Sequence, residues 1–263
     1  MKALFIGYGR MGGALGNAWL NSGLIEQLSI VDPGLPENSA ERCYASVGDV
    51  PDEPFDLIVL AVKPAYASEV LAGVSDRQCA QAVVISVAAG VTQATLGNAV
   101  RQRCPVVRAM PNTPVLVGAG CTGLYAGSQV DASQRAWIGQ LFEAVGMACW
   151  VDAETQLDAV TAISGSGPAY YHLFSEALAQ AGIRLGLEPE LARRLAAQTA
   201  FGAATLQHQP QADFAELRIA VTSPNGTTAA AIEVFEEQGK LRQLVETATS
   251  AAYRRSVELS RNG

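Results

Sequence analysis

Hydrophobic positions in the first 150 residues form short runs that alternate with helical patterns. Residues 57–62 form a continuous apolar run, and residues 82–87 are apolar except for Ser86. Such runs are typical of strands buried on both faces of a sheet. The other predicted strands are residues 3–6, 28–31, 106–107 and 121–125, and residues 11–21 are the first predicted helix. Alternating strands and helices predict a doubly wound, mostly parallel α/β sheet.

The pattern changes near residue 152. From residue 154 to residue 260, alanine, leucine and glutamate recur at helical spacing, with breaks at residues 164–168, 186–189, 209–210 and 222–226. These breaks predict five or six helices and no strand. We therefore expect two domains, an α/β domain over residues 1–152 and an all-helical domain over residues 153–263.

Composition narrows the class of protein. Of the 263 residues, 49% are hydrophobic and 16% are charged, which favours a folded chain with a sizeable core. The net charge of −7 argues against a nucleic-acid partner, since phosphate binding needs a basic face. The N-terminal apolar run is cut short by Gly7, too early for a secretory signal, and no run is long enough to span a membrane. A cytoplasmic protein is expected.

The cysteines indicate neither a disulfide framework nor a metal site. There are five of them, with no C-x-x-C pair, and only two histidines. An odd number at wide spacing predicts reduced, mostly packed thiols, and a zinc site would lack its usual ligands.

Residues 7–12 fit the pattern G-x-G-x-x-G. The match follows a predicted strand and opens a predicted helix, which is the context of a dinucleotide-binding turn. The first glycine permits the tight turn, the second lets a pyrophosphate approach the backbone, and the third allows close packing of helix on strand. The candidate cofactor-binding residues here are Gly7, Tyr8, Gly9, Arg10, Met11 and Gly12. The pattern predicts a Rossmann-like N-terminal domain.

Asp32 lies twenty residues beyond Gly12, at the end of the second predicted strand. A carboxylate there can accept hydrogen bonds from the adenosine ribose and repel a 2′-phosphate. The alternative interpretation is a plain turn, because Asp-Pro-Gly is a common turn sequence.

Two later strand ends also carry candidate cofactor contacts. In open α/β sheets the ligand lies outside the carboxyl ends of the strands. The candidates are Ala61, Val62, Lys63 and Pro64 after one strand and Asn112 after another. Lys63 is expected to point into the crevice, and Asn112 has the size and polarity to hold a carboxamide. An exposed loop lysine and an ordinary turn are the alternatives.

Two polar segments of the helical half are candidates for binding substrate. Residues 222–228 form a turn before a predicted helix, and the free N–H groups of a helix start suit a carboxylate. The hydroxyls of Ser223, Thr227 and Thr228 add donors. Helix capping alone is the alternative. Residues 164–170 begin another helix at Pro168 and fit helix–helix packing equally well.

Together these segments resemble one enzyme family. The motifs that carry the resemblance are residues 7–11, 61–64 (AVKP), 110–114 (MPNTP), 164–170 (SGSGPAY) and 221–228 (VTSPNGTT). They occur in the order and over nearly the full length seen in pyrroline-5-carboxylate reductases. The first motif is shared by many dehydrogenases, whereas the last two are quite specific to that family.

The resemblance implies reduction of the C=N bond of 1-pyrroline-5-carboxylate to L-proline by NADPH or NADH, the last step of proline synthesis. It implies a Rossmann-like domain followed by a helical dimerisation domain, in a homo-oligomer built from interlocked dimers. The substrate pocket is expected at the dimer interface. The implied substrate-binding residues are Ser223, Asn225, Gly226, Thr227 and Thr228, and the hydroxyl of Thr228 is expected to reach the ring nitrogen.

Three positions bear on how this chain differs from the family. Arg10 stands where the family usually has asparagine, and Asn225 stands where it usually has glycine. Asparagine tolerates positive φ best among the other residues, so we expect the turn to survive. Many members favour NADPH, and the carboxylate of Asp32 is expected to shift the preference toward NADH.

Two other functions fit parts of the sequence. A 3-hydroxyacid dehydrogenase of the hydroxyisobutyrate type also has G-x-G-x-M-G, but it needs a lysine in the helical domain. The only lysine after Lys63 is Lys240, far from residue 164. A nicotinamide sensor without catalysis is the second alternative, and the intact polar turn at residues 222–228 argues against it.

Overall fold

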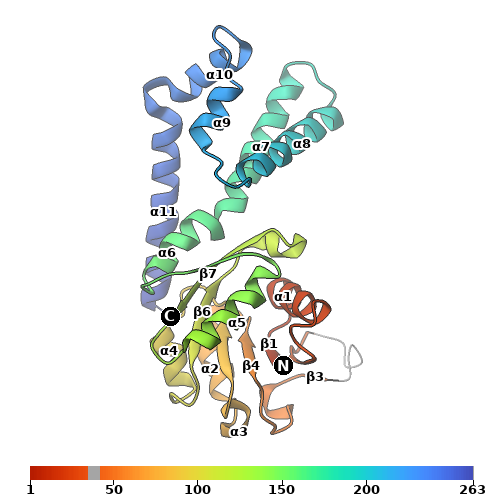
Figure 1. The fold of residues 1–263 in the computed structure, drawn as a ribbon, viewed down its shortest axis with the longest axis vertical. Coiled ribbons are helices and arrows are strands. Elements are labelled where there is room, and N and C mark those ends of the chain that lie inside the picture. Colours follow the sequence, from red (N-terminus) through yellow and green to blue (C-terminus); the bar gives the residue numbers. More distant parts are fainter. Residues whose placement is uncertain (35–41, 263) are drawn as a thin grey trace. The chain divides into compact units, whose positions relative to one another are not determined.

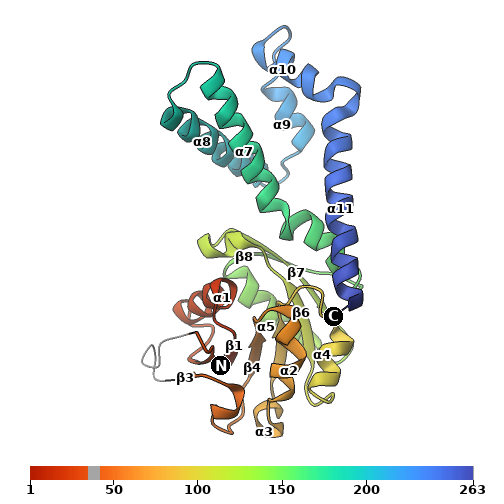
Figure 2. The same cartoon turned by 180° about the vertical axis from the view of Figure 1, so that it is seen from behind.

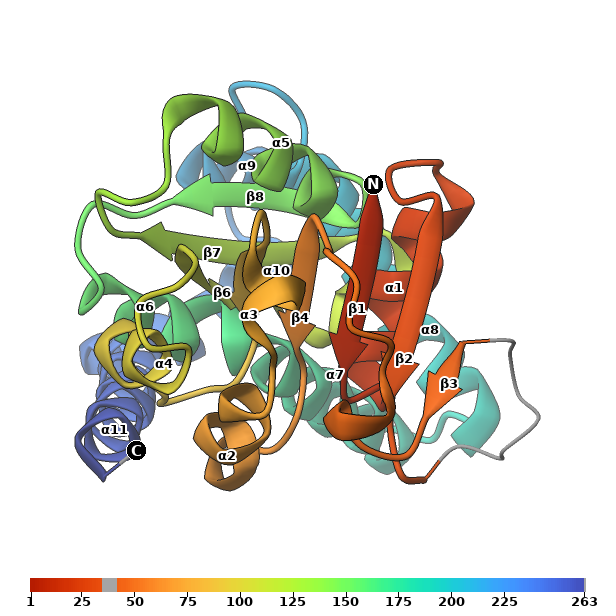
Figure 3. The same cartoon turned by 90° about the horizontal axis from the view of Figure 1, so that it is seen from below.

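A computed structural model describes residues 1–34 and 42–262 of the chain. The described residues form an eight-stranded sheet with the order β3-β2-β1-β4-β5-β6-β7-β8 (Figure 3). The strands are β1 Lys2–Ile6, β2 Gln27–Val31, β3 Cys43–Tyr44, β4 Leu57–Leu60, β5 Val83–Ser86, β6 Val106–Met110, β7 Gly120–Ala126 and β8 Gly146–Trp150. Neighbouring strands are parallel except β6 and β7. The predicted doubly wound sheet is confirmed.

All six predicted strands are present, and two strands were missed. β3 has only two residues, too few for a periodic pattern. β8 is half-exposed along its length. It begins at Gly146, where a Cβ would lie 2.1 Å from the carbonyl oxygen of Gly120. This glycine pair lets β7 and β8 start close together.

Helices cover both faces of the sheet. In this part of the chain they are α1 Arg10–Asn21, α2 Ala67–Ala72, α3 Asp76–Cys79, α4 Gln93–Ala99 and α5 Ala132–Glu143, with 3₁₀ turns η1 Val47–Asp49, η2 Pro64–Tyr66 and η3 Thr113–Val117. One apolar cluster joins the sheet to α1 and α5, which lie in front of it in Figure 1, and another joins it to α2, α3 and α4 (Figure 2). Trp19 of α1 is fully buried between Phe5 and Phe142, with ring centroids 5.7 and 5.4 Å apart.

The C-terminal part is helical, as predicted. Its helices are α6 Gln156–Val160, α7 Gly167–Arg184, α8 Pro189–Gln207, α9 Phe214–Ala220, α10 Thr227–Glu236 and α11 Lys240–Asn262, with a π-helical turn η4 Thr161–Gly165 and a 3₁₀ turn η5 Glu237–Gly239. The breaks near residues 186, 209 and 222 separate helices as expected. The break at residue 164 is the π-helical turn, and the kink at Gln238, where φ is 54°, was missed.

The boundary between the two compact units lies at a different residue from the change in amino-acid composition near residue 152. One unit comprises Met1–Ser166 with Ala251–Gly263, and the other comprises Gly167–Ser250. The helical texture begins earlier, near residue 152, but α6 and η4 contact β7. The end of α11 also belongs with the sheet, since a Cβ on Gly90 would lie 2.9 Å from the Cβ of Leu259.

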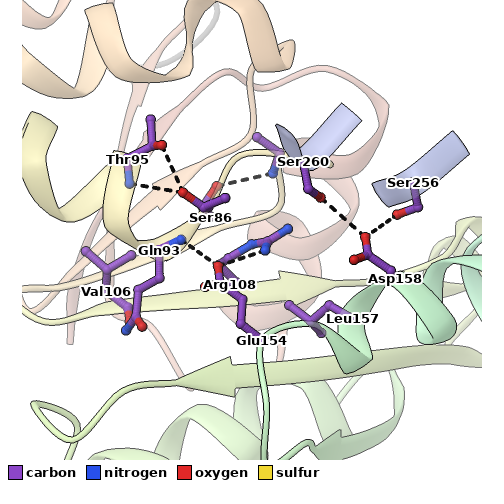
Figure 4. Close-up of polar contacts among 12 residues, drawn as sticks. Ser86, Gln93, Thr95, Val106, Arg108, Glu154, Leu157, Asp158, Ser256 and Ser260 are labelled. Atoms are coloured by element: carbon purple, nitrogen blue, oxygen red, sulfur yellow. Dashed lines mark hydrogen bonds and ion pairs between the residues drawn. The ribbon is translucent and has the colours of Figure 1, made fainter. Parts of the chain in front are cut away.

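Polar contacts around two carboxylates, those of Asp158 and Glu154, hold this junction together (Figure 4). The hydroxyl of Ser256 in α11 donates to Asp158 of α6 at 2.6 Å, and Ser260 donates to the same oxygen at 3.3 Å. The Arg108 guanidinium on β6 donates to Glu154 at 2.8 Å, and the same oxygen of Glu154 accepts the N–H of Gln93 at 2.6 Å. The carboxylates therefore tie the C-terminal helix and the start of α4 to the sheet.

Replacing Ser256 with alanine tests the first of these contacts. The change removes the shorter of the two hydroxyl bonds to the buried carboxylate of Asp158, which is worth about 1.5–3 kcal/mol. The melting temperature is expected to fall by roughly 3–10 °C in calorimetry. Ser133→Ala is the matched control, because the Ser133 hydroxyl bonds to Asp131 at an exposed helix start. Equal melting temperatures for the two variants would contradict the assignment.

Candidate active site

The glycine-rich turn after β1 is packed against the end of β4. Gly7 has φ +89°, and a Cβ there would lie 2.6 Å from the carbonyl oxygen of Ala61. A Cβ on Gly12 would lie 2.4 Å from the carbonyl oxygen of Gly7. The N–H of Gly7 donates to Val31 at the end of β2, at 2.7 Å. Glycine is required at both positions, and the turn brings the carboxyl ends of three strands together.

Gly9 leaves open space where α1 begins. It is the N-cap of α1, no side chain caps the helix, and a Cβ there would meet nothing within 4 Å. The first N–H groups of a helix have no partner within the helix and attract anions. An uncapped start with clear space above it fits the pyrophosphate of a dinucleotide.

Asp32, directly after β2, is held by two backbone groups. Its Oδ2 accepts the N–H of Tyr8 at 2.8 Å, and its Oδ1 accepts the N–H of Gly34 at 2.9 Å. The second bond closes the predicted turn at residues 32–34. The first ties the carboxylate to the glycine-rich turn, so the same group shapes the loop and faces the candidate cofactor crevice.

A cavity of about 640 Å³ lies at this edge of the sheet, a size typical of small-molecule sites. The candidate residues that line it are Gly7, Gly9, Asp32, Ala61, Val62 and Lys63. Its lining also includes Ser46, Tyr66 and Glu69, which were not predicted as site residues from the sequence. Glu69 lies on α2, a six-residue helix without a motif, and only its place shortly after residues 61–64 could have drawn attention to it. Among the described residues, the lining carries two carboxylates, of Asp32 and Glu69, and one ammonium, of Lys63.

Five other candidate cofactor residues do not line this cavity. Arg10 is exposed, Pro64 begins η2, Gly12 packs on Gly7, and Met11 packs against the core on the α1 face.

The fifth residue, Tyr8, is held by its neighbours. Its ring packs edge-on against Phe5, and its hydroxyl donates to Asn17 at 2.8 Å. Burial raises the pKa of Tyr8 to about 12, because the phenolate would lose hydration. The phenol therefore stays neutral at physiological pH.

Asn112 also lies outside the cavity, and its amide already has protein partners. Its Nδ2 donates to the carbonyl of Ser164 at 2.9 Å, and its Oδ1 accepts the N–H of Cys121 at 2.8 Å. The side chain is only 8% exposed. The role predicted from sequence, holding a carboxamide, stays a prediction, and the structure adds a different one.

The turn at residues 222–226 leads into α10 as expected. Asn225 adopts φ 59°, which confirms that asparagine can take the left-handed conformation this turn needs. The N–H of Gly226 donates to the carbonyl of Ser223 at 3.0 Å. Gly226 is the N-cap of α10, and no side chain caps the helix. Thr227 is exposed and Thr228 half-buried, so donors of this helix start remain available to a carboxylate.

A second cavity, of about 630 Å³, lies among α9, α10 and α11. It is lined by apolar side chains and by Glu236, which pairs with Arg218 and Arg242. Arg242 holds the pKa of Glu236 below its usual range. The candidate substrate residues do not line this cavity.

Residues 1–34 and 42–262 contain no cluster of three or more histidine, cysteine or acidic residues that could hold a metal ion. No helix among them is long and apolar enough to cross a membrane.

Comparison with known proteins places this geometry in a family. Residues 154–259 match the family model described as pyrroline-5-carboxylate reductase dimerisation, and residues 2–90 match that of an NADP oxidoreductase, coenzyme F420-dependent. A pyrroline-5-carboxylate reductase of Pseudomonas aeruginosa is 43% identical, with 98% of this chain and 97% of the relative covered. The chain belongs to the pyrroline-5-carboxylate reductase family.

Solved structures of pyrroline-5-carboxylate reductases share the fold over the full length. The Coxiella burnetii enzyme has a TM-score of 0.87 at 35% identity, covering 98% of both chains. The Plasmodium falciparum pyrroline carboxylate reductase, solved with NADP bound, has a TM-score of 0.86 at 30% identity, covering 99% of this chain and 98% of that chain. The helical half is therefore a dimerisation domain, and oligomerisation is a property of the chain.

Gly9→Ala tests the anion site at the start of α1. The new methyl group meets no protein atom within 4 Å, so the fold is expected to tolerate it, with a melting temperature within about 2 °C of the parent. The same methyl group blocks the close approach of a pyrophosphate, and the Kd for NADH is expected to rise by about tenfold or more.

Gly13→Ala is the control, because Gly13 lies in the same helix, α1. Its Cβ would make an ordinary contact, 3.5 Å from the carbonyl oxygen of Tyr8. Its Kd for NADH is expected to equal that of the parent, measured by NADH fluorescence. Unchanged NADH affinity in Gly9→Ala would exclude the proposed anion site.

Proposed function

We propose that residues 1–152 bind the dinucleotide and that residues 153–263 hold the substrate and the partner subunit. The two family models, which match residues 2–90 and 154–259, support this division. The reaction itself is the reduction of the C=N bond of 1-pyrroline-5-carboxylate to L-proline, with NADH or NADPH as reductant. Two observations carry the proposal together. One is 43% sequence identity to such a reductase over 98% of this chain, and the other is a cavity at the carboxyl edge of the sheet.

The cofactor is proposed to lie along the carboxyl ends of β1, β2, β4 and β6. The uncapped start of α1 above Gly9 takes the pyrophosphate, and Asp32 accepts hydrogen bonds from the adenosine ribose. Lys63 supplies the positive charge on the other side of the crevice. The proposed set is Gly7, Tyr8, Gly9, Arg10, Met11, Gly12, Asp32, Ala61, Val62, Lys63 and Pro64, whereas the amide of Asn112 is engaged with Ser164 and Cys121. The open space above Gly9 supports the fit.

The substrate carboxylate is proposed to bind at the start of α10. The left-handed Asn225 and the uncapped Gly226 leave the first N–H groups of the helix unpaired, and the helix dipole favours an anion there. The proposed set is Ser223, Asn225, Gly226, Thr227 and Thr228.

The chemistry asks for alignment more than for a strong acid. Reduced nicotinamide supplies the hydride to the ring carbon of the C=N bond. A cyclic imine is basic enough to be protonated near neutral pH, and the iminium is already electrophilic. Holding the reacting rings in place contributes up to roughly 7–11 kcal/mol. The Thr228 hydroxyl donates to the imine nitrogen or relays a proton to the product amine.

The assembly is proposed to be a homo-oligomer of interlocked dimers in the cytoplasm, with no nucleic-acid partner. Large apolar side chains stand exposed on the helical unit, among them Leu173, Phe174, Leu195 and Phe201. Exposed apolar patches of this kind are typical of subunit interfaces. The net charge of −7 opposes nucleic-acid binding.

Thr228→Ala tests the proposed catalytic hydroxyl. With 1-pyrroline-5-carboxylate and NADH, kcat is expected to fall by about a hundredfold, the usual contribution of a positioned proton donor. The Kd for NADH is expected to stay unchanged. Thr228→Ser, which keeps the hydroxyl, is the matched variant and is expected to retain most of the activity. Equal turnover in Thr228→Ala and the parent rejects the role, and no NADH oxidation by the parent rejects the function.

The acidic lining of the cavity gives a second prediction, a preference for NADH. Asp32 and Glu69 both line the cavity, and residues 35–41 contain no lysine or arginine. Arg42, the next cation, is paired with Glu53 at 2.7 Å. The 2′-phosphate of NADPH therefore meets repulsion, and kcat/KM is expected to favour NADH by about tenfold or more.

Asp32→Asn removes the charge and keeps an oxygen that can accept the N–H of Tyr8. Its preference for NADH is expected to shrink by about tenfold, mainly through a lower KM for NADPH. Glu143→Gln, an exposed charge change on α5, is expected to leave the preference as it is. A parent enzyme that clearly prefers NADPH would overturn the assignment of Asp32.

A further inference from the structure

Asn112 joins three separate pieces of the sheet unit. It follows β6 and is the N-cap of η3. Its amide donates to the Ser164 carbonyl in η4 and accepts the Cys121 N–H in β7. Both bonds have ordinary N–H···O lengths, 2.9 and 2.8 Å, and the side chain is buried. An asparagine is the residue that can donate to one backbone group and accept from another with one planar group.

The carbonyl of Ser164 has a specific need for that donor. In an α-helix it would accept the N–H four residues later, but that residue is Pro168, which has no N–H. The backbone there takes a π-helical turn, in which Ser166 donates to the carbonyl of Thr161 at 2.8 Å. π-Helical turns are rare and often occur at functional sites. Asn112 replaces the donor that proline removes.

The bond also fixes where residues 164–166 lie. A Cβ on Gly165 would be 3.1 Å from the terminal methyl of Met110, so this segment lies against the carboxyl end of β6. The carboxyl ends of β1, β4, β5 and β6 share one edge of the sheet, because these strands are parallel. Asp32 marks the adenosine half of that edge, and β6 belongs to the opposite half, where a doubly wound sheet holds the second nucleotide.

We infer that Asn112 is a positioning residue for hydride transfer, acting through the π-helical turn at Ser164. By supplying the donor for the Ser164 carbonyl, it holds this turn at the reacting end of the cofactor crevice. The inference rests on the proposed function. It differs from the carboxamide contact expected from sequence, because the Asn112 amide is engaged with the protein.

Asn112→Asp isolates the donor. The introduced carboxylate can still accept the N–H of Cys121, but it cannot donate to Ser164. At about pH 8 kcat is expected to fall by about thirtyfold, while the Kd for NADH stays within about threefold. Asn98→Asp is the matched control, since Asn98 is exposed on α4, and it is expected to behave like the parent.

The pH profile separates positioning from a general loss of stability. As the pH falls, the introduced carboxyl group is protonated, and its O–H can again donate to the Ser164 carbonyl. The ratio of variant to parent kcat is therefore expected to rise by about fivefold between about pH 8 and pH 5.5. Amide hydrogen exchange at residues 161–166 is expected to be faster than in the parent at the higher pH, and this measurement needs no activity.

A second variant guards against misfolding. In Asn112→Asp combined with Pro168→Ala, the alanine N–H can take over as donor to Ser164, and kcat at the higher pH is expected to exceed that of Asn112→Asp by about tenfold. If Asn112→Asp alone does not fold, the double variant must fold and turn over.

Three results overturn the inference: kcat of folded Asn112→Asp close to the parent, a Kd for NADH that rises as far as kcat falls, or no recovery from either low pH or Pro168→Ala. A parent without reductase activity refutes the proposed function instead, and the exchange measurement still decides the role of Asn112.

Discussion

The close approach of the β1–α1 turn to the end of β4 is the constraint on which the rest of this structure depends. Gly7 must take a positive φ, and neither Gly7 nor Gly12 has room for a Cβ against the carbonyls of Ala61 and Gly7. This contact points the start of α1 at the carboxyl edge of the sheet. Asp32 is then fixed to the same turn through the N–H of Tyr8. The crevice exists because backbone can meet backbone at these glycines.

The fold and the candidate site also depend on polar side chains that join separate segments. Asn112 donates to the carbonyl that Pro168 leaves without a partner, and Asp158 receives two hydroxyls from α11. Each joins segments far apart in the sequence. The sheet unit is therefore closed by side-chain hydrogen bonds between segments that share no regular helix or strand pairing.

Sequence analysis predicted the structural features that depend on residue type or on a short periodic pattern. The buried strands β4 and β5 appear as apolar runs, and the stereochemical need for Gly7 and Gly12 appears as a motif. The resemblance to pyrroline-5-carboxylate reductases, carried by the polar turns, was confirmed by full-length relatives. β8 was missed because its side chains are half-exposed. The return of α11 to the sheet was missed because the contact of Asp158 with Ser256 joins residues 98 apart and leaves no local pattern.

Asp32 has two roles, and together they limit how the cofactor preference of this enzyme can change. The carboxylate shapes the loop through Tyr8 and Gly34, and it also faces the cavity that the cofactor is proposed to enter. A mutation that merely discards the charge, such as one to alanine, also discards both loop contacts. An evolutionary or laboratory route to the phosphorylated cofactor must therefore keep an acceptor at this position while adding a cation nearby. Two coordinated changes are therefore needed, one at this position and one that supplies the cation.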